Sequence, residues 1–214
     1  MASLVRGVGF AIMAFLAFGV ALFSYRYLVP GAPGGAPEIL ANRFTHLGAL
    51  TVHAGFAATA LILGAFQFLR PLRARWPVVH RWMGTAYVVS VLLGGSAGLL
   101  LALGTTAGPV AAAGFGLLAI TWLGATGGAW RLARARDFAR HQRWMTRSYA
   151  LTLAAVTLRI YMPLASAIGL DPAVSYVAIS WLAWVPNLMI AELWLALGGP
   201  RTSPLRAATS RMPG

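Results

Sequence analysis

Six long apolar runs, separated by short polar or glycine- and proline-rich connectors, dominate the pattern of this 214-residue chain. Each run has about 20 residues or more, the length that an α-helix needs to cross roughly 30 Å of hydrocarbon. The pattern predicts helices over residues 4–29, 43–69, 81–103, 110–132, 144–168 and 173–197. The sequence therefore predicts an all-α integral membrane protein, built as a bundle of six transmembrane helices.

The composition supports this class and excludes several kinds of chemistry. Hydrophobic residues make up 59% of the chain and charged residues only 10%, whereas soluble domains carry about 25% charged residues. There is no cysteine, which excludes disulfides, thiolate metal sites and cysteine-attached haem. The chain has only four acidic residues, and they are too dispersed to form paired catalytic carboxylates. No catalytic residue can be assigned.

The arginines predict the orientation in the membrane. All 17 basic residues are arginine, and they gather in the connectors, which indicates topology and not nucleic-acid binding. Placing both termini and the two arginine-rich connectors on one side gives that side 14 arginines and the other side two. The 14 are Arg6, Arg70, Arg73, Arg75, Arg81, Arg131, Arg134, Arg136, Arg140, Arg143, Arg147, Arg201, Arg206 and Arg211. The positive-inside rule then predicts an inner-membrane protein with both termini in the cytoplasm.

The runs and connectors divide the chain into four parts. Residues 1–42 contain the first helix and a Gly/Pro-rich outer loop, and residues 43–168 form a four-helix core. Residues 169–198 contain the sixth helix, and residues 199–214 read as a disordered, basic cytoplasmic tail. A signal peptide is the alternative for the first run. The run is long for that role and lacks a clear polar cleavage region, so we expect an uncleaved helix.

A short sequence motif, or phrase, occurs twice in the four-helix core. His80-Arg-Trp-Met-Gly84 is followed by Tyr87, and His141-Gln-Arg-Trp-Met145 is followed by Tyr149. The two histidines are 61 residues apart, and each phrase sits between an arginine-rich connector and an apolar run. Arginine and tryptophan at a membrane boundary are also ordinary anchors. The matching order of residues favours a second interpretation, in which helices two and three and helices four and five are two related hairpins.

Polar residues follow one face of the second helix. His46, His53 and Gln67 are spaced by seven and fourteen residues, so they share a slowly drifting helix face. Ionisable side chains inside a membrane are costly and usually turn toward the bundle interior. We expect these residues to face the other helices, where His53 either contributes to a functional pocket or only hydrogen-bonds a neighbouring helix.

Arg159 lies within the fifth apolar run, in the half of the membrane away from the arginine-rich connectors. Thr152 and Ser166 are seven residues to either side and share its face. The sequence places no carboxylate at its depth. Arg159 could bond backbone carbonyls or reach Asp171 by snorkelling. It could instead contact an anionic or carbonyl-bearing ligand, such as a haem propionate, a quinone oxygen or a lipid phosphate.

Glu192 is the only acidic residue within an apolar run. It is expected at the cytoplasmic boundary, at the same level as His80, His141 and Arg147. A salt bridge to one of these three is the simplest expectation.

Prolines and glycines predict where the helices bend and approach one another. Pro163 and Pro186 should kink the fifth and sixth helices. The pairs Gly94–Gly98 and Gly124–Gly128 have the small-xxx-small spacing that lets membrane helices pack closely.

The histidines can be tested as ligands of a haem iron. Two axial nitrogens must lie about 4 Å apart, twice a metal–nitrogen length of about 2 Å. His46 and His53 share one helix and cannot approach one iron from opposite sides. His80 and His141 are at matching depth on separate helices, so they are the credible axial pair. Two alternatives remain: a mixed site that adds Glu192, or two solvated interface residues that precede their helices.

Three segments of the core resemble the DUF2306 family of membrane proteins. They are His53 with Gly64-Ala-Phe-Gln67-Phe, then His80-Arg-Trp-Met-Gly-Thr-Ala-Tyr87, then His141-Gln-Arg-Trp-Met-Thr-Arg-Ser-Tyr149 running on to Arg159. The resemblance covers residues 45–170, with Ala65 where the family pattern has a proline. It implies a multi-helix membrane architecture without assigning a reaction. It also implies that five residues occupy the family's motif positions: His53, Gln67, His80, His141 and Arg159. A looser likeness to b-type haem bundles is an analogy of fold only.

Three hypotheses of function follow. The first is a redox or other cofactor-binding protein, in which His80 and His141 hold haem b while His53, Gln67 and Arg159 line a pocket. The second is a small-molecule or proton-coupled carrier, with His53, Gln67 and Arg159 along its path. The third is a structural or assembly subunit without a ligand. The expected partners are the lipid bilayer and a quinone or other small molecule.

Overall fold

The computed structural model describes residues 2–29 and 47–197, and within them every regular element is a helix. The uninterrupted helices are α1 (Ala2–Tyr25), α3 (Leu47–Gln67), α5 (Pro77–Leu103) and α6 (Pro109–Arg134). The others are η1 (Arg26–Leu28), α4 (Arg70–Arg75), α7 (Phe138–Thr152), α8 (Ala154–Ala167), α9 (Pro172–Leu182) and α10 (Val185–Leu197). Six spans in this described part are long and apolar enough to cross a membrane, which confirms the fold class. The predicted tail and His46 lie outside the described residues.

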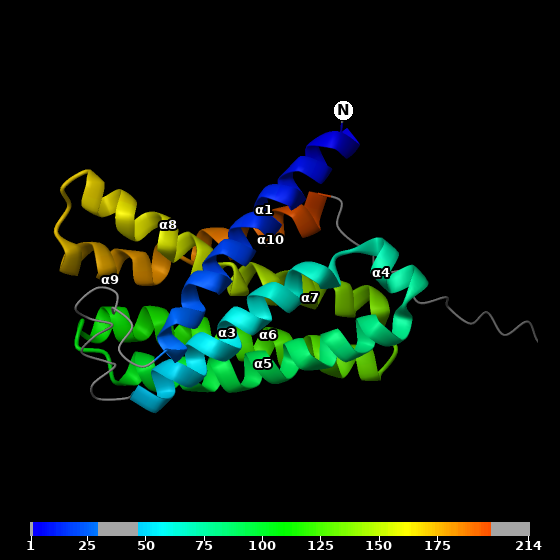
Figure 1. Cartoon of the computed structure of the whole chain (residues 1–214), viewed down its shortest axis with the longest axis horizontal. Coiled ribbons are helices and arrows are strands. Elements are labelled where there is room, and N and C mark those ends of the chain that lie inside the picture. The colour runs from blue at the N-terminus through cyan, green and yellow to red at the C-terminus, as the bar shows by residue number, and fades with distance from the viewer. Residues whose placement is uncertain (1, 30–46, 198–214) are drawn as a thin grey trace, which may run out of the picture.

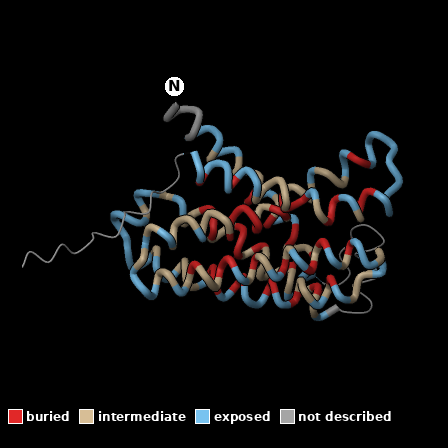
Figure 2. Tube along the Cα trace, turned by 180° about the vertical axis from the view of Figure 1, so that it is seen from behind, coloured by how far each residue is buried: buried red, intermediate tan, exposed pale blue. Residues whose placement is uncertain are grey.

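The bundle is organised around α5, which packs against α3 on one side and α6 on the other. Helix α6 also packs against α7, and α1 crosses α3 obliquely (Figure 1). Helices α8 and α9 form a hairpin in which α9 packs against α6 and α8 lies on the far side of α9 from that helix (Figure 1). Buried residues concentrate where these elements meet, and exposed ones cover the periphery (Figure 2).

The outer surface of the bundle is apolar. Large hydrophobic side chains such as Phe15, Leu103 and Leu197 are exposed. A soluble monomer rarely exposes so much contiguous apolar surface, whereas lipid tails solvate it without cost. This surface is therefore the one that the bilayer covers.

Helices α5 and α7 begin earlier than the sequence pattern predicts. Pro77 occupies the start of α5, where its missing N–H costs nothing. Asp137 caps α7 by accepting a hydrogen bond from the backbone N–H of Arg140 at 3.1 Å. His80 and His141 therefore lie inside the first turns of their helices, and the expectation that they precede them is wrong.

The fifth and sixth spans are each interrupted near their middle. The fifth breaks at Leu153, ten residues before Pro163, which lies inside α8. The sixth breaks at residues 183–184, just before Pro186. Pro186 has no N–H to bond the carbonyl of Leu182, so the break in the sixth span has the expected cause. The break in the fifth span does not coincide with the proline that was expected to bend it.

Two polar side chains join these interruptions. Thr157 donates to the carbonyl of Leu153 at 3.2 Å, and Asn187 donates to the carbonyl of Ala183 at 3.0 Å. The Asn187 amide also donates to the Thr157 hydroxyl at 2.9 Å. The bond between Asn187 and Thr157 fixes the two interrupted spans side by side at their breaks.

A second polar contact holds α7 to α10. The Arg147 guanidinium makes a two-pronged pair with the Glu192 carboxylate, with Nη2 donating to Oε2 at 2.9 Å. This confirms the expected salt bridge and identifies Arg147 as the partner. Arg147 also lies over the Trp144 ring, 5.3 Å from its centroid, and Arg143 donates to the carbonyl of Leu195 at 3.2 Å.

The two glycine pairs behave differently. A Cβ added at Gly94 would lie 3.0 Å from the backbone nitrogen of Ala57, so this glycine lets α5 pack closely against α3, and not against α6 as expected. At Gly124 nothing lies within 4 Å, and the prediction of close packing there is wrong. Gly128 instead makes room for the Trp144 ring, 3.3 Å from its added Cβ.

Candidate functional site

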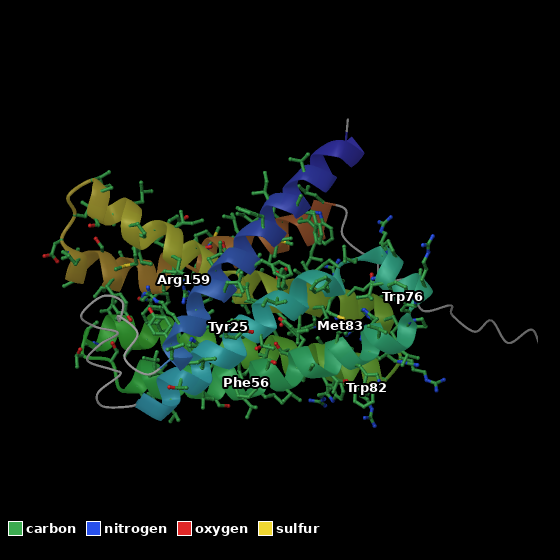
Figure 3. All side chains as sticks on the ribbon, in the orientation of Figure 1. Tyr25, Phe56, Trp76, Trp82, Met83 and Arg159 are labelled. Carbon is green, nitrogen blue, oxygen red and sulfur yellow. The ribbon has the colours of Figure 1, made fainter. Side chains whose placement is uncertain are left out.

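A cavity of about 210 Å³ lies inside the bundle, lined by residues of η1, α3, α5, α6, α8 and α9 and by the ends of α1 and α7. Its walls are mostly small or aliphatic, for example Ala54, Ala57 and Leu118. Small residues on facing helices leave this space because their side chains do not fill the gap between the backbones. Figure 3 shows Arg159 on α8, close to the end of α1 that carries Tyr25.

His53 and Arg159 both line this cavity. The Nδ1 atom of His53 lies 2.8 Å from the carbonyl oxygen of Gly94 on α5. A carbonyl only accepts hydrogen bonds, so Nδ1 carries the proton, and Nε2 of the neutral ring is left as an acceptor. A Cβ added at Gly98 would lie 2.8 Å from the same Nδ1, so glycine is needed there to seat the ring. His53 thus makes the expected interhelical bond and also faces the cavity.

Arg159 is held by its own helix. Its Nη1 donates to the carbonyl of Ala155, one turn earlier, at 3.1 Å. Within residues 2–29 and 47–197, no carboxylate forms a salt bridge with it. Asp171, the acid considered from the sequence, instead caps α9 by accepting from the N–H of Val174 at 2.9 Å. The backbone alternative is therefore confirmed, and most of the guanidinium's hydrogen-bonding capacity remains open.

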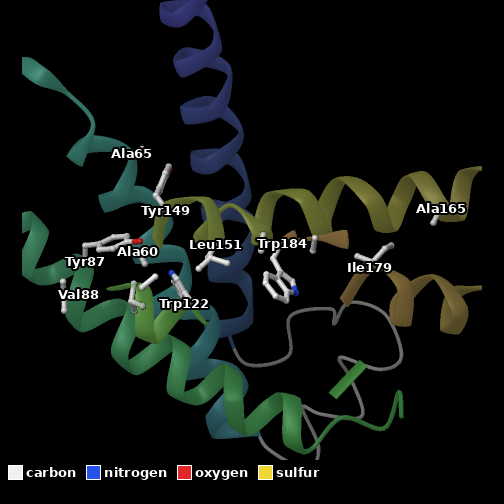
Figure 4. Close-up of a cluster of buried hydrophobic side chains, with 14 residues drawn as sticks. Ala60, Ala65, Tyr87, Val88, Trp122, Tyr149, Leu151, Ala165, Ile179 and Trp184 are labelled. Atoms are coloured by element: carbon white, nitrogen blue, oxygen red, sulfur yellow. The ribbon is translucent and has the colours of Figure 1, made fainter. Parts of the chain in front are cut away.

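A buried hydroxyl network forms one end of the cavity. The Tyr87 hydroxyl lies 2.6 Å from Ser148 Oγ and 2.9 Å from Thr152 Oγ1. Thr126 Oγ1 lies 2.7 Å from Ser148 Oγ, and Trp122 Nε1 donates to Thr152 Oγ1 at 2.9 Å. Trp122 and Thr152 also line the cavity. Three helices, α5, α6 and α7, are thus tied together at this level. Figure 4 shows two of these side chains, Tyr87 and Trp122, within the buried core.

Sequence reasoning did not identify this network. The repeated tyrosines, four residues after each methionine, were the available signal. Both are buried: Tyr87 bonds the hydroxyl network, and Tyr149 donates to the carbonyl of Leu61 at 3.1 Å. The tyrosines, and not the tryptophans, are therefore the residues of the repeat that anchor the core.

Replacing Tyr87 by phenylalanine should lower the thermal unfolding midpoint in detergent. The substitution removes a buried hydroxyl that contacts two others, and a lost buried hydrogen bond costs about 1–3 kcal/mol. Tyr25→Phe is the control, because its hydroxyl contacts only Thr59, at 2.9 Å and partly exposed. Equal shifts for the two variants would contradict a special role for the network.

The remaining predicted residues lie elsewhere. Gln67, His80 and His141 do not line the cavity. The Nδ1 atom of His141 is bonded to the carbonyl of Ala129 at 2.9 Å, while His80 Nδ1 and Gln67 Nε2 are buried without a hydrogen-bond partner. The structure therefore brings His53 and Arg159 together and keeps the His80–His141 pair apart from them. Haem ligation by that pair stays a prediction.

The mixed metal site that would add Glu192 to the two histidines is wrong. In the described part of the chain, no three His, Cys, Asp or Glu side chains are grouped so that they could hold a metal ion. Glu192 is already paired with Arg147, and that pairing satisfies its charge.

Comparison with known proteins identifies a family to which the chain is similar. The model of a family described as "Predicted membrane protein (DUF2306)" matches residues 50–195. No curated protein and no solved structure matches the chain. The matched region includes both copies of the repeat, the cavity histidine and Arg159. Since this match covers more than half of the sequence, the chain belongs to the DUF2306 family of predicted membrane proteins.

Proposed function

We propose that this protein binds a small amphipathic molecule in the cavity that His53 and Arg159 line. One observation carries the proposal: an apolar cavity inside the bundle contains an arginine that no described carboxylate neutralises. A charged side chain at membrane depth costs several kcal/mol and is usually associated with a ligand or ion path. An apolar pocket with few polar groups is also the common form of a small-molecule site.

The size of the cavity limits the ligand. A volume of about 210 Å³ has room for a small molecule with one short apolar chain. On α3 the lining residues run from Leu50 to Leu61, about 16 Å at 1.5 Å per residue. This elongated wall suits an extended chain with its polar group near Arg159 and its apolar end near Trp122.

Tryptophan fluorescence provides the test. Bromine quenches tryptophan at short range, so 8-bromooctanoate and 8-bromo-1-octanol should quench Trp122 saturably in protein reconstituted into nanodiscs. Ala155→Leu fills the cavity wall beside Arg159 and should abolish the saturable component. Ala113→Leu is the matched control, because Ala113 is exposed on α6 and does not line the cavity. The proposal fails if neither probe saturates, or if Ala155→Leu leaves the quenching unchanged.

A second candidate function is haem b binding by His80 and His141, at a place separate from the cavity. The hydrogen bond from His141 Nδ1 to the Ala129 carbonyl supports it, because metal-binding histidines usually donate their other nitrogen to such a partner. The unpartnered Nδ1 of His80 also supports it. A Soret band in the purified protein, lost in both His80→Ala and His141→Ala, is the expected result. Haem-supplemented protein without that band would exclude this function.

The arginine distribution supports an inner-membrane location with both termini in the cytoplasm. Because the chain has no cysteine, single cysteines can report on each side directly. In intact spheroplasts, a membrane-impermeant maleimide should label Thr106→Cys, in the uncharged connector, and should not label Arg134→Cys. Both positions are exposed. Labelling of Arg134→Cys alone would reverse the proposed orientation.

A further inference from the structure

We infer that the ligand of this cavity is an anion, a single-chain carboxylate, and that Arg26 supplies a second guanidinium to hold it. The inference rests on the proposed function and specifies the chemical class of the ligand. Its starting point is the end of α1, where the chain tightens into η1 (Arg26–Leu28). This turn brings Tyr27 onto the cavity wall, and Arg26, which does not itself line the cavity, donates to the Tyr27 hydroxyl.

Arg26 is only partly satisfied by the protein. Its Nη2 donates to the Tyr27 hydroxyl at 3.2 Å, and its guanidinium carbon lies 3.8 Å from the centroid of the Phe23 ring. Its Nε is buried without a hydrogen-bond partner. As with Arg159, none of the acidic residues that the structure describes forms a salt bridge with it.

Arg159 and Tyr27 line the same cavity, and Arg26 donates to the Tyr27 hydroxyl, so Tyr27 connects the second guanidinium to the cavity that contains the first. Two positive charges near each other in a low-dielectric interior repel, and the repulsion is larger than it would be in water. An anion between them removes the repulsion and provides acceptors for the unpartnered donors. Arg159 on the cavity wall, and Arg26 bonded to Tyr27 of that wall, are therefore the two cations available to an anion in this cavity.

The geometry of the cavity specifies the kind of anion. A guanidinium presents a planar fork of donors that matches a carboxylate. The cavity has a mainly apolar wall and a volume of about 210 Å³, which suits a single short apolar chain. A carboxylate on one short apolar chain satisfies both constraints. His53 then lies along the chain, and its Nε2 can accept from a hydroxyl substituent.

Three brominated eight-carbon probes have the same chain and differ in the charge of the head group: 8-bromooctanoate, 8-bromo-1-octanol and 8-bromooctylammonium. Differences in their affinity therefore report on the charge that the cavity prefers. At pH 7 the carboxyl group is ionised. We expect the octanoate to bind at least about tenfold more tightly than the alcohol, the effect of one charge-assisted hydrogen bond, and the ammonium to bind most weakly. Arg26→Gln should remove about tenfold of the octanoate affinity and leave the alcohol unchanged.

Two further variants make the experiment interpretable. Arg26→Lys keeps the charge and should retain most of the preference for octanoate, even if Arg26→Gln folds poorly. Arg75→Gln removes an exposed arginine far from the cavity and should change nothing. Equal affinity for octanoate and alcohol, unaffected by Arg26→Gln, would overturn the anion inference while leaving the proposed binding function intact. Absence of saturable quenching by all three probes would overturn both.

Discussion

Gly64→Ala should destabilise the protein strongly, because the added methyl group falls where two buried rings already meet. It would collide with the ring of Tyr149 and lie 2.9 Å from Cε2 of Tyr87. These rings are 2% and 0% exposed, and the hydroxyl of each is fixed by hydrogen bonds. Neither ring can move away without breaking those bonds. Overpacking of this kind costs about 1–3 kcal/mol and occasionally more.

Gly124→Ala is the matched control for this substitution. Gly124 is also in the interior of a long helix, but nothing lies within 4 Å of its added Cβ. Alanine should therefore be neutral there or stabilise by up to about 1 kcal/mol through helix propensity. Thermal unfolding midpoints in detergent measure both effects. Equal midpoints for the two variants would mean that the tyrosines of the repeat do not anchor the core.

Arg159→Met should weaken ligand binding and, at the same time, stabilise the ligand-free protein. It should weaken 8-bromooctanoate binding about tenfold or more, since it removes a charge-assisted hydrogen bond. It should also raise the stability of the ligand-free protein by on the order of 1 kcal/mol, because replacing poorly compensated buried charge by apolar side chains is often stabilising. A residue retained for binding is expected to show this combination. A residue retained for structure is not.

The control is Arg147→Met at the opposite end of the bundle. Arg147 is paired with Glu192 and ties α7 to α10, so its removal leaves a carboxylate without its partner. Its removal should lower the unfolding midpoint and leave probe binding unchanged. If Arg159→Met lowers the midpoint as Arg147→Met does, Arg159 has a structural role and the argument for a ligand is lost.

The sequence alone predicted six spans. It also predicted that His53 and Arg159 face the interior of the bundle. Both follow from one physical fact, the cost of polar groups in hydrocarbon. Because of that cost, the membrane-spanning runs are almost entirely apolar. A polar residue within such a run therefore indicates a buried partner or a functional site. The salt bridge of Glu192 followed for the same reason, since only a few cations lie at its level.

The helix starts could not be predicted from hydrophobicity, because Pro77 and Asp137 begin their helices in polar sequence. Arg26 counted in the sequence only as one of the two arginines on the outer side, since η1 is what places it next to Tyr27 of the cavity wall. The cavity itself depends on alanines and glycines from several helices, for example Ala57 and Gly98. A sequence pattern does not show which small residues face one another.

The most direct test of the central claim is the position of the bromine atom in crystals of the protein grown with 8-bromooctanoate. The account predicts an anomalous peak inside the cavity, near Trp122 and Leu61, with the carboxylate against Arg159. A peak confined to the lipid-facing surface, with the cavity free of the probe, would contradict it.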